Sequence, residues 1–186
     1  MARPSDPGIR LRLRNAAIDY VLSHGVVGLS LRPLAKALHT NARMLVYHFG
    51  SREGLMREIL MGLREREDAR IQAWFRRGGK RRTLTEFLRW YWNRMSDPRA
   101  RPAVMLIFEL YALALRDPQG YPGVLTDPLD YWQKLAGMAG ESREAGAEEA
   151  TLLLAATRGL LLDLCASQDR LRVEKAMKRL AGLVEE

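Results

Sequence analysis

The segment that most constrains the fold of this chain is residues 29–55, LSLRPLAKALHTNARMLVYHFGSREGL. It holds two short stretches with apolar residues at helical spacing, separated by a turn and followed by a third, capped stretch. Ser30 is a favourable N-cap, and Pro33 falls in the first turn, where a missing N–H breaks no helical hydrogen bond. Asn41 caps the second stretch and Ser51 the third. A helix, a tight turn and a helix in this order can place one helix in the major groove of DNA.

Positive charge is concentrated over the same part of the chain. The sequence has 30 Lys and Arg against 22 Asp and Glu, a formal net charge of +8. Residues 1–52 hold eight basic and two acidic residues, a net +6, whereas residues 53–186 hold 22 basic and 20 acidic, a net +2. Basic side chains displace the counterions of DNA and so give affinity for any sequence. A solvated basic surface would explain the charge alone, but charge and helix pair together indicate double-stranded DNA as the partner.

An amphipathic stripe before the helix pair predicts one further helix, which makes a three-helix unit. The stripe consists of Ile9, Leu13, Ala16, Ala17, Tyr20 and Val21. Arg10 and Arg14 lie side by side at its edge. Two interpretations stay open for these arginines, namely contacts with DNA phosphates or charge that only keeps the surface soluble.

LVYHFGSREGL resembles the L-Y-x-H-F-x-(S/N)-K-x-x-L signature of tetracycline-repressor (TetR) family regulators, and SLRPLAKAL resembles the second helix of the same module. The sequence departs from the pattern at Val46, in place of a Tyr, and at Arg52, in place of a Lys. Arg43 stands where a small residue is common, and His39 must adopt a turn conformation that suits Gly or Asn. The resemblance implies an all-α protein, with an N-terminal three-helix helix-turn-helix DNA-binding domain at 1–50. A helical ligand-binding and dimerisation domain then follows at 51–186.

The recognition helix is predicted to begin at Asn41 and to end near Tyr47. Arg43 can make a bidentate contact with guanine, and Met44 an apolar contact with the methyl group of thymine. Flanking side chains are expected to contact the DNA backbone and fix the register of the helix. The expected DNA-binding residues are Ser30, Arg32, Asn41, Ala42, Arg43, Met44, Tyr47, His48 and Arg52.

The last two helices are expected to form a homodimer. TLLLAATRGLLLDLCA is apolar nearly all round, and such a helix is buried on more than one side. The final helix repeats apolar residues, including Val173 and Met177, at the same kind of spacing. Two-fold symmetry would present two recognition helices roughly 34–36 Å apart and predicts a palindromic operator. The alternative is an ordinary hydrophobic core.

The middle of the chain is expected to enclose a ligand pocket. Glu109 lies in an otherwise apolar segment, MLIFELYALAL, and a carboxylate there needs a partner or a wet cavity. It could bind a polar or cationic group with aromatic faces nearby. The tentative ligand-binding residues are Trp90, Met105, Phe108, Glu109 and Trp132. The alternative is a plain aromatic core, with Glu109 paired to an arginine or at a surface edge.

The sequence also argues against disulfides, membrane spans, metal sites and catalysis. Cys165 is the single cysteine, so the chain forms no internal disulfide, and with no visible signal peptide we expect a cytoplasmic protein. Arg158 and Asp163 interrupt the longest apolar run, which we therefore expect to be too short to span a membrane. The three histidines are scattered and no catalytic motif occurs, so we expect no metal, no cofactor and no enzymatic activity.

The function predicted from these features is a ligand-responsive transcriptional regulator, most readily a repressor. The dimer would bind its operator, and a small-molecule effector that favours another conformation would release it. Two alternatives remain. One is a constitutive DNA-binding protein without an effector, and the other is a helical enzyme with a cavity near Glu109.

Overall fold

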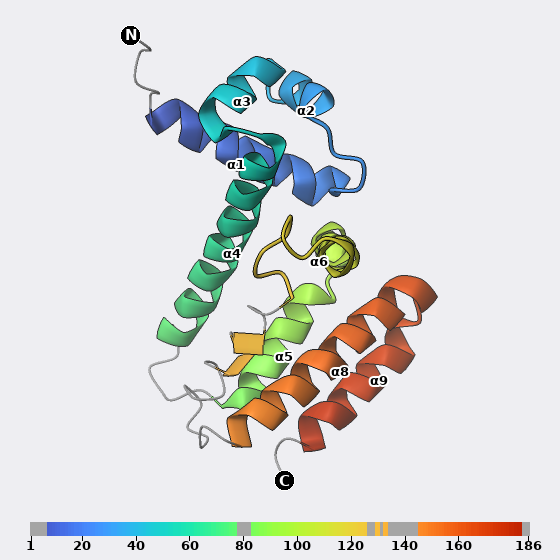
Figure 1. Cartoon of the computed structure of the whole chain (residues 1–186). Helices are drawn as coiled ribbons and strands as arrows, with labels where there is room; N and C mark the ends of the chain where they lie inside the picture. The colour runs from blue at the N-terminus through green and yellow to red at the C-terminus, as the bar shows by residue number, and fades with distance from the viewer. Residues whose placement is uncertain (1–6, 78–82, 126–128, 131, 134–144, 184–186) are drawn as a thin grey trace. The chain divides into compact units, whose positions relative to one another are not determined.

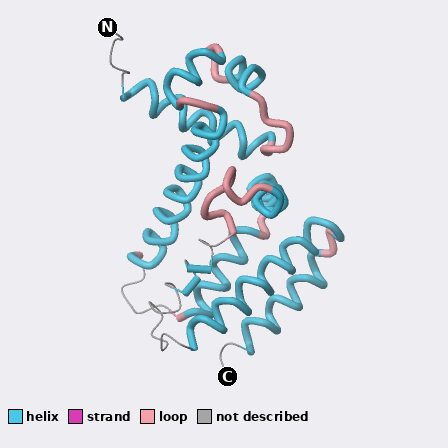
Figure 2. Tube along the Cα trace, in the orientation of Figure 1, coloured by secondary structure: helices cyan, strands magenta, loops and turns pink. Residues whose placement is uncertain are grey.

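The computed structural model describes residues 7–77, 83–125, 129–130, 132–133 and 145–183, and these residues contain helices and loops but no strand (Figures 1 and 2). The all-α prediction is therefore confirmed. The helices are α1 (Pro7–His24), α2 (Leu31–Ala37), α3 (Ala42–Phe49), α4 (Arg52–Arg76), α5 (Leu84–Met95), a short 3₁₀ turn (Pro98–Ala100), α6 (Arg101–Arg116), α8 (Ala145–Ser167) and α9 (Arg170–Leu183).

The chain forms two compact units. The first comprises Met1–Trp74 and Leu106–Pro122, so most of α6 packs with the N-terminal helices. The second comprises Phe75–Met105 and Gly123–Glu186. The division into functional domains at residue 50 stays a prediction.

In the first unit, two of the three predicted N-cap residues make the expected capping hydrogen bond. The Asn41 side chain accepts a hydrogen bond from the Met44 amide at 2.9 Å, and the Ser51 hydroxyl accepts one from the Gly54 amide at 3.0 Å. Ser30 has the extended backbone of an N-cap but its hydroxyl makes no capping bond, which corrects the expectation for that residue. His39 has φ +53°, so the predicted strained turn residue is confirmed.

The second unit is built on an aromatic cluster and a buried face of α9. Thr83 and Glu86 form a reciprocal capping box that starts α5. Val173 and Met177 on α9 are 0% and 3% exposed. They lie in the core of this chain, so their spacing no longer supports a dimer interface, and the interface through the last two helices stays a prediction. The apolar spacing of α9 reflects packing against α5 and α8 of the same chain.

Helix α8 leaves an apolar face uncovered in the protomer. Leu152 is 67% and Leu162 is 51% exposed, and Gly159 between them faces open space. Within the described residues, the segment Ala147–Ser167 is long and apolar enough to cross a membrane, by length and composition alone. This corrects the expectation that the apolar run is too short, although one such helix is weak evidence for a membrane span.

Candidate nucleic-acid interface

Helix α3 is amphipathic, with a buried anchor face and an exposed face. Leu45 is 0% exposed and Phe49 is 7% exposed, and both pack into the first unit. On the other face Tyr47 is 50% exposed and Val46 is 42% exposed, while Arg43 is also exposed. A short helix whose solvent face carries an arginine and a tyrosine has the composition of a groove-reading helix.

The remaining expected DNA contacts divide by exposure. Ser30, Arg32 and Asn41 are exposed, whereas Ala42 and Met44 are half-buried. His48 is buried and packs edge-on against the Tyr47 ring, with the two ring centres 5.1 Å apart. Its ring nitrogens have no hydrogen-bond partner within the described residues. The His48 ring is therefore buried and lies edge-on against the exposed Tyr47 ring.

Arg52 at the start of α4 is exposed, and its side chain makes a hydrogen bond to the loop between α1 and α2. Its Nε donates a hydrogen bond to the Leu29 carbonyl at 3.0 Å, just before α2 begins. Glu53 follows at the N-terminus of α4, where a backbone N–H, the Ser51 hydroxyl and neighbouring arginines lower the pKa of its carboxyl. The segment from Gly50 to Glu53 therefore caps α4 and also ties that helix to the loop before α2.

Arg10 and Arg14 on α1 form ion pairs with α4. Arg10 Nη2 lies 2.5 Å from Glu58 Oε1, and Arg14 Nη2 lies 2.8 Å from Glu65 Oε1. The Arg14 Nε also donates to the Glu58 backbone carbonyl at 3.0 Å. The Arg14 guanidinium lowers the pKa of the Glu65 carboxyl through the side-chain hydrogen bond between these two residues and through its charge. These arginines clamp α1 to α4, a role that neither sequence interpretation included.

The tentative ligand-binding residues are divided between the two units. In the second unit, Trp90 and Trp132 pack around Phe87, with ring centres 5.8 and 5.4 Å from the Phe87 ring. Met105 belongs to the same unit and is 41% exposed. Phe108 and Glu109 belong to the first unit, where Glu109 Oε2 accepts a hydrogen bond from the Val26 amide at 2.8 Å. The partner of Glu109 is thus a backbone N–H.

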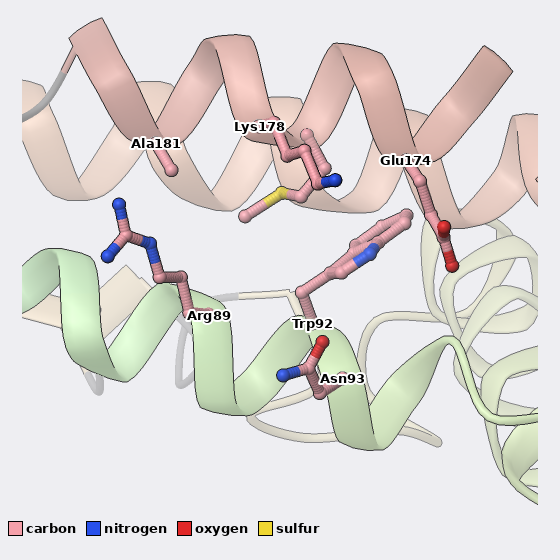
Figure 3. A pocket seen from close by; sticks show the side chains of 7 residues that line it. Arg89, Trp92, Asn93, Glu174, Lys178 and Ala181 are labelled. Carbon is pink, nitrogen blue, oxygen red and sulfur yellow. The ribbon is translucent and has the colours of Figure 1, made fainter. Parts of the chain in front are cut away.

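A groove between α5 and α9 was not predicted from the sequence. It has a volume of about 350 Å³, and Figure 3 shows Arg89 and Asn93 on α5 facing Lys178 and Ala181 on α9. Its full lining is Arg89, Trp92, Asn93, Glu174, Met177, Lys178 and Ala181, and none of the tentative ligand-binding residues is among them. The residues come from segments far apart in the chain, so only the packing of α5 on α9 brings them together. Within the described residues no group of His, Cys, Asp or Glu side chains can hold a metal ion.

Fold and exposed helix together define a helix-turn-helix DNA-binding protein with a helical C-terminal region. No family model matches the chain. An HTH-type transcriptional regulatory protein of Mycobacterium tuberculosis is 42% identical over 53 residues, which are 28% of this chain and 24% of that protein. The chain therefore matches this curated relative over about a quarter of the relative's length.

Solved structures resemble the chain over nearly its whole length. A Rhodococcus sp. protein assigned to the TetR family of transcriptional regulators superposes with a TM-score of 0.69 at 20% identity, over 95% of this chain and 96% of that one. The multidrug-binding protein EbrR, solved with imidazole, gives 0.68 at 25% identity over 94% and 96%. The chain thus has the fold of solved TetR-type regulators, and the resemblance of its N-terminal sequence to that family is confirmed.

Proposed function

We propose that the protein is a ligand-responsive repressor that binds a palindromic operator as a homodimer. The observation that carries the proposal is the exposed face of α3, where Arg43 and Tyr47 project from a helix anchored by Leu45. Arg43 would read guanine, and Ser30, Arg32 and Arg52 would contact the DNA backbone. Such a protein would act in the cytoplasm.

The exposed stripe of α8 supports the homodimer. Leu152, Ala155, Gly159 and Leu162 recur at helical spacing on this solvent-exposed face. Covering such a stripe with the same stripe of a second copy would remove apolar surface from water, and the small residues would allow close approach of the helices. The exposed face of α9 would complete the interface.

The groove between α5 and α9 is our candidate effector site. Its floor is apolar, since Trp92, Met177 and Ala181 are all buried, and its walls carry Arg89 and Lys178. Glu174 is the acidic residue of the lining, and its Oε1 forms an ion pair with Arg170 Nε at 2.6 Å. A small organic anion with an aromatic or short aliphatic body would match this floor and these walls.

The proposal is tested by fluorescence anisotropy of a labelled operator duplex, obtained by selection, with the full-length protein. We expect tight binding that weakens steeply as salt rises, and release when an aromatic carboxylate such as salicylate or indole-3-acetate is added. Trp92→Phe should weaken release, whereas Trp90→Phe, outside the groove, should not. Binding that no carboxylate changes would favour a constitutive DNA-binding protein. Turnover of an added compound, unaffected by Arg43→Ala, would favour an enzyme.

A further inference from the structure

The loop between α1 and α2, residues 25–30, is held by two side chains that come from outside the helix pair. Glu109 on α6 accepts a hydrogen bond from the Val26 amide at 2.8 Å, although the two residues are 83 positions apart in the chain. Arg52 on α4 donates to the Leu29 carbonyl at 3.0 Å. All of these residues belong to the first compact unit, in which α6 lies beside the end of α1 (Figure 1).

Gly25 shows how closely the carboxylate approaches the loop. Its φ of +76° lies in the left-handed region that favours glycine. A Cβ at this position would also lie 2.5 Å from Glu109 Oε2 and 2.8 Å from Oε1, closer than real Cβ contacts. Gly28 has a similar φ of +70° but faces open space. The two glycines therefore share a backbone constraint and differ in their contact with Glu109.

The hydrogen bond to Val26 is positioned to control where α2 begins. Val26 is only 2% exposed, so its amide has little access to water if the carboxylate is removed. The Val26 carbonyl accepts from the Leu29 amide at 3.1 Å, which makes the loop a short turn leading into α2. Helix α2 then packs against α3. A continuous chain of contacts therefore runs from Glu109 to the recognition helix.

We propose that Glu109 is a positioning residue for DNA recognition, which sets the α1–α2 loop and through it the placement of α2 and α3. The proposal rests on the proposed DNA-binding function. The Glu109 side-chain oxygen accepts from an amide that is buried, so losing this acceptor would leave the amide without its partner. This contact with the loop explains why a carboxylate occurs in the otherwise apolar segment of α6, without a bound ligand.

The first test measures the loop without DNA. Hydrogen exchange at the Val26 amide of the full-length protein should be roughly tenfold faster or more in Glu109→Ala. Glu109→Gln keeps an oxygen acceptor and should retain most of the protection. Circular dichroism melting of each variant separates a loop effect from global unfolding. Unchanged Val26 exchange in folded Glu109→Ala would overturn the proposal.

The second test measures recognition with the selected operator duplex. Glu109→Ala should weaken binding several-fold, and Glu109→Gln should restore most of it. Gly25→Ala should lose more operator affinity than Gly28→Ala. Adding Glu109→Ala should recover part of that loss in the Gly25→Ala variant but not in the Gly28→Ala variant. Equal losses of operator affinity in Glu109→Ala and Glu109→Gln would contradict the proposal. So would effects of Gly25→Ala and Glu109→Ala that simply add in the double variant. If the wild-type protein binds no duplex, the proposed function fails, while the exchange result still decides the loop contact.

Discussion

At the scale of single residues, burial separates the anchoring side chains of α3 from those that we propose contact DNA. Leu45 and Phe49 are buried anchors, while Arg43 and Tyr47 project outward. The Asn41 cap fixes the first turn of the helix that carries Arg43. His48 is buried against Tyr47, and its contact with DNA stays a prediction.

Arg43→Ala should lower the preference for one base pair in each half-site. A bidentate arginine–guanine contact discriminates against the wrong base by about 1–3 kcal/mol. The measurement is the affinity for operators with single base-pair changes, and Arg116→Ala, which removes an exposed charge from α6, is the control. A uniform loss of affinity for all sequences would show that Arg43 contacts only the DNA backbone.

At the scale of helices, the first unit depends on close packing of α1 against α4. Gly62 on α4 is buried, and a Cβ there would overlap the Ile18 side chain and lie 3.2 Å from the Arg14 guanidinium. The same arginine pairs with Glu65 on α4. A glycine in the middle of a helix is normally unfavourable, so its presence here is explained by the close approach of α1.

Gly62→Ala should destabilise the protein by about 1–3 kcal/mol, because overpacking outweighs the gain in helix propensity. Gly182→Ala is the matched control, since its Cβ would face open space on α9. We expect this second change to be neutral or slightly stabilising. Chemical denaturation measures both, and equal effects at the two sites would contradict the packing argument.

An ion pair between Arg172 and Asp163 joins α8 and α9, and from it we predict a stability that depends on pH. Arg172 donates to both oxygens of Asp163 at 2.8 Å, and Gln168 between them has φ +57°. The guanidinium holds the pKa of the Asp163 carboxyl below its usual value. A carboxyl with a lowered pKa in the folded state stabilises the fold above its unfolded pKa and loses this contribution as pH falls.

The wild-type protein should therefore melt at a higher temperature than Asp163→Asn near neutral pH. The difference should shrink as pH falls below about 4, the ordinary pKa of an aspartate, and through the lower pKa of the folded state. Thermal melts across this range measure it. A difference in melting temperature that stays constant with pH would show that the charge of Asp163 does not contribute to stability.

At the scale of the whole molecule, the exposed apolar stripe of α8 is the surface through which we propose that two copies of the chain associate. Leu162→Lys should place a charge in the proposed interface and raise the dimer dissociation constant by at least tenfold. Leu115→Lys is the matched control, because Leu115 is 71% exposed on α6. Analytical ultracentrifugation distinguishes them, and a dimer that survives Leu162→Lys would place the interface elsewhere.

The sequence predicted the fold well where signals are local, and missed contacts between distant segments. The Asn41 and Ser51 caps and the strained His39 follow from residue chemistry within a few positions. The pairing of Arg14 with Glu65, or of Glu109 with Val26, depends on how helices pack, which periodicity does not specify. The same limit explains Val173 and Met177, whose spacing shows that α9 is buried on one face without showing what covers it.

The central claim is that a dimer presents two copies of α3 to successive major grooves. Selection of bound duplexes from a random pool by the full-length protein tests it most directly. The predicted result is a palindrome whose half-site centres lie about 10 base pairs, one helical turn, apart, or a multiple of that spacing. Salt-sensitive binding with no sequence preference would contradict the claim.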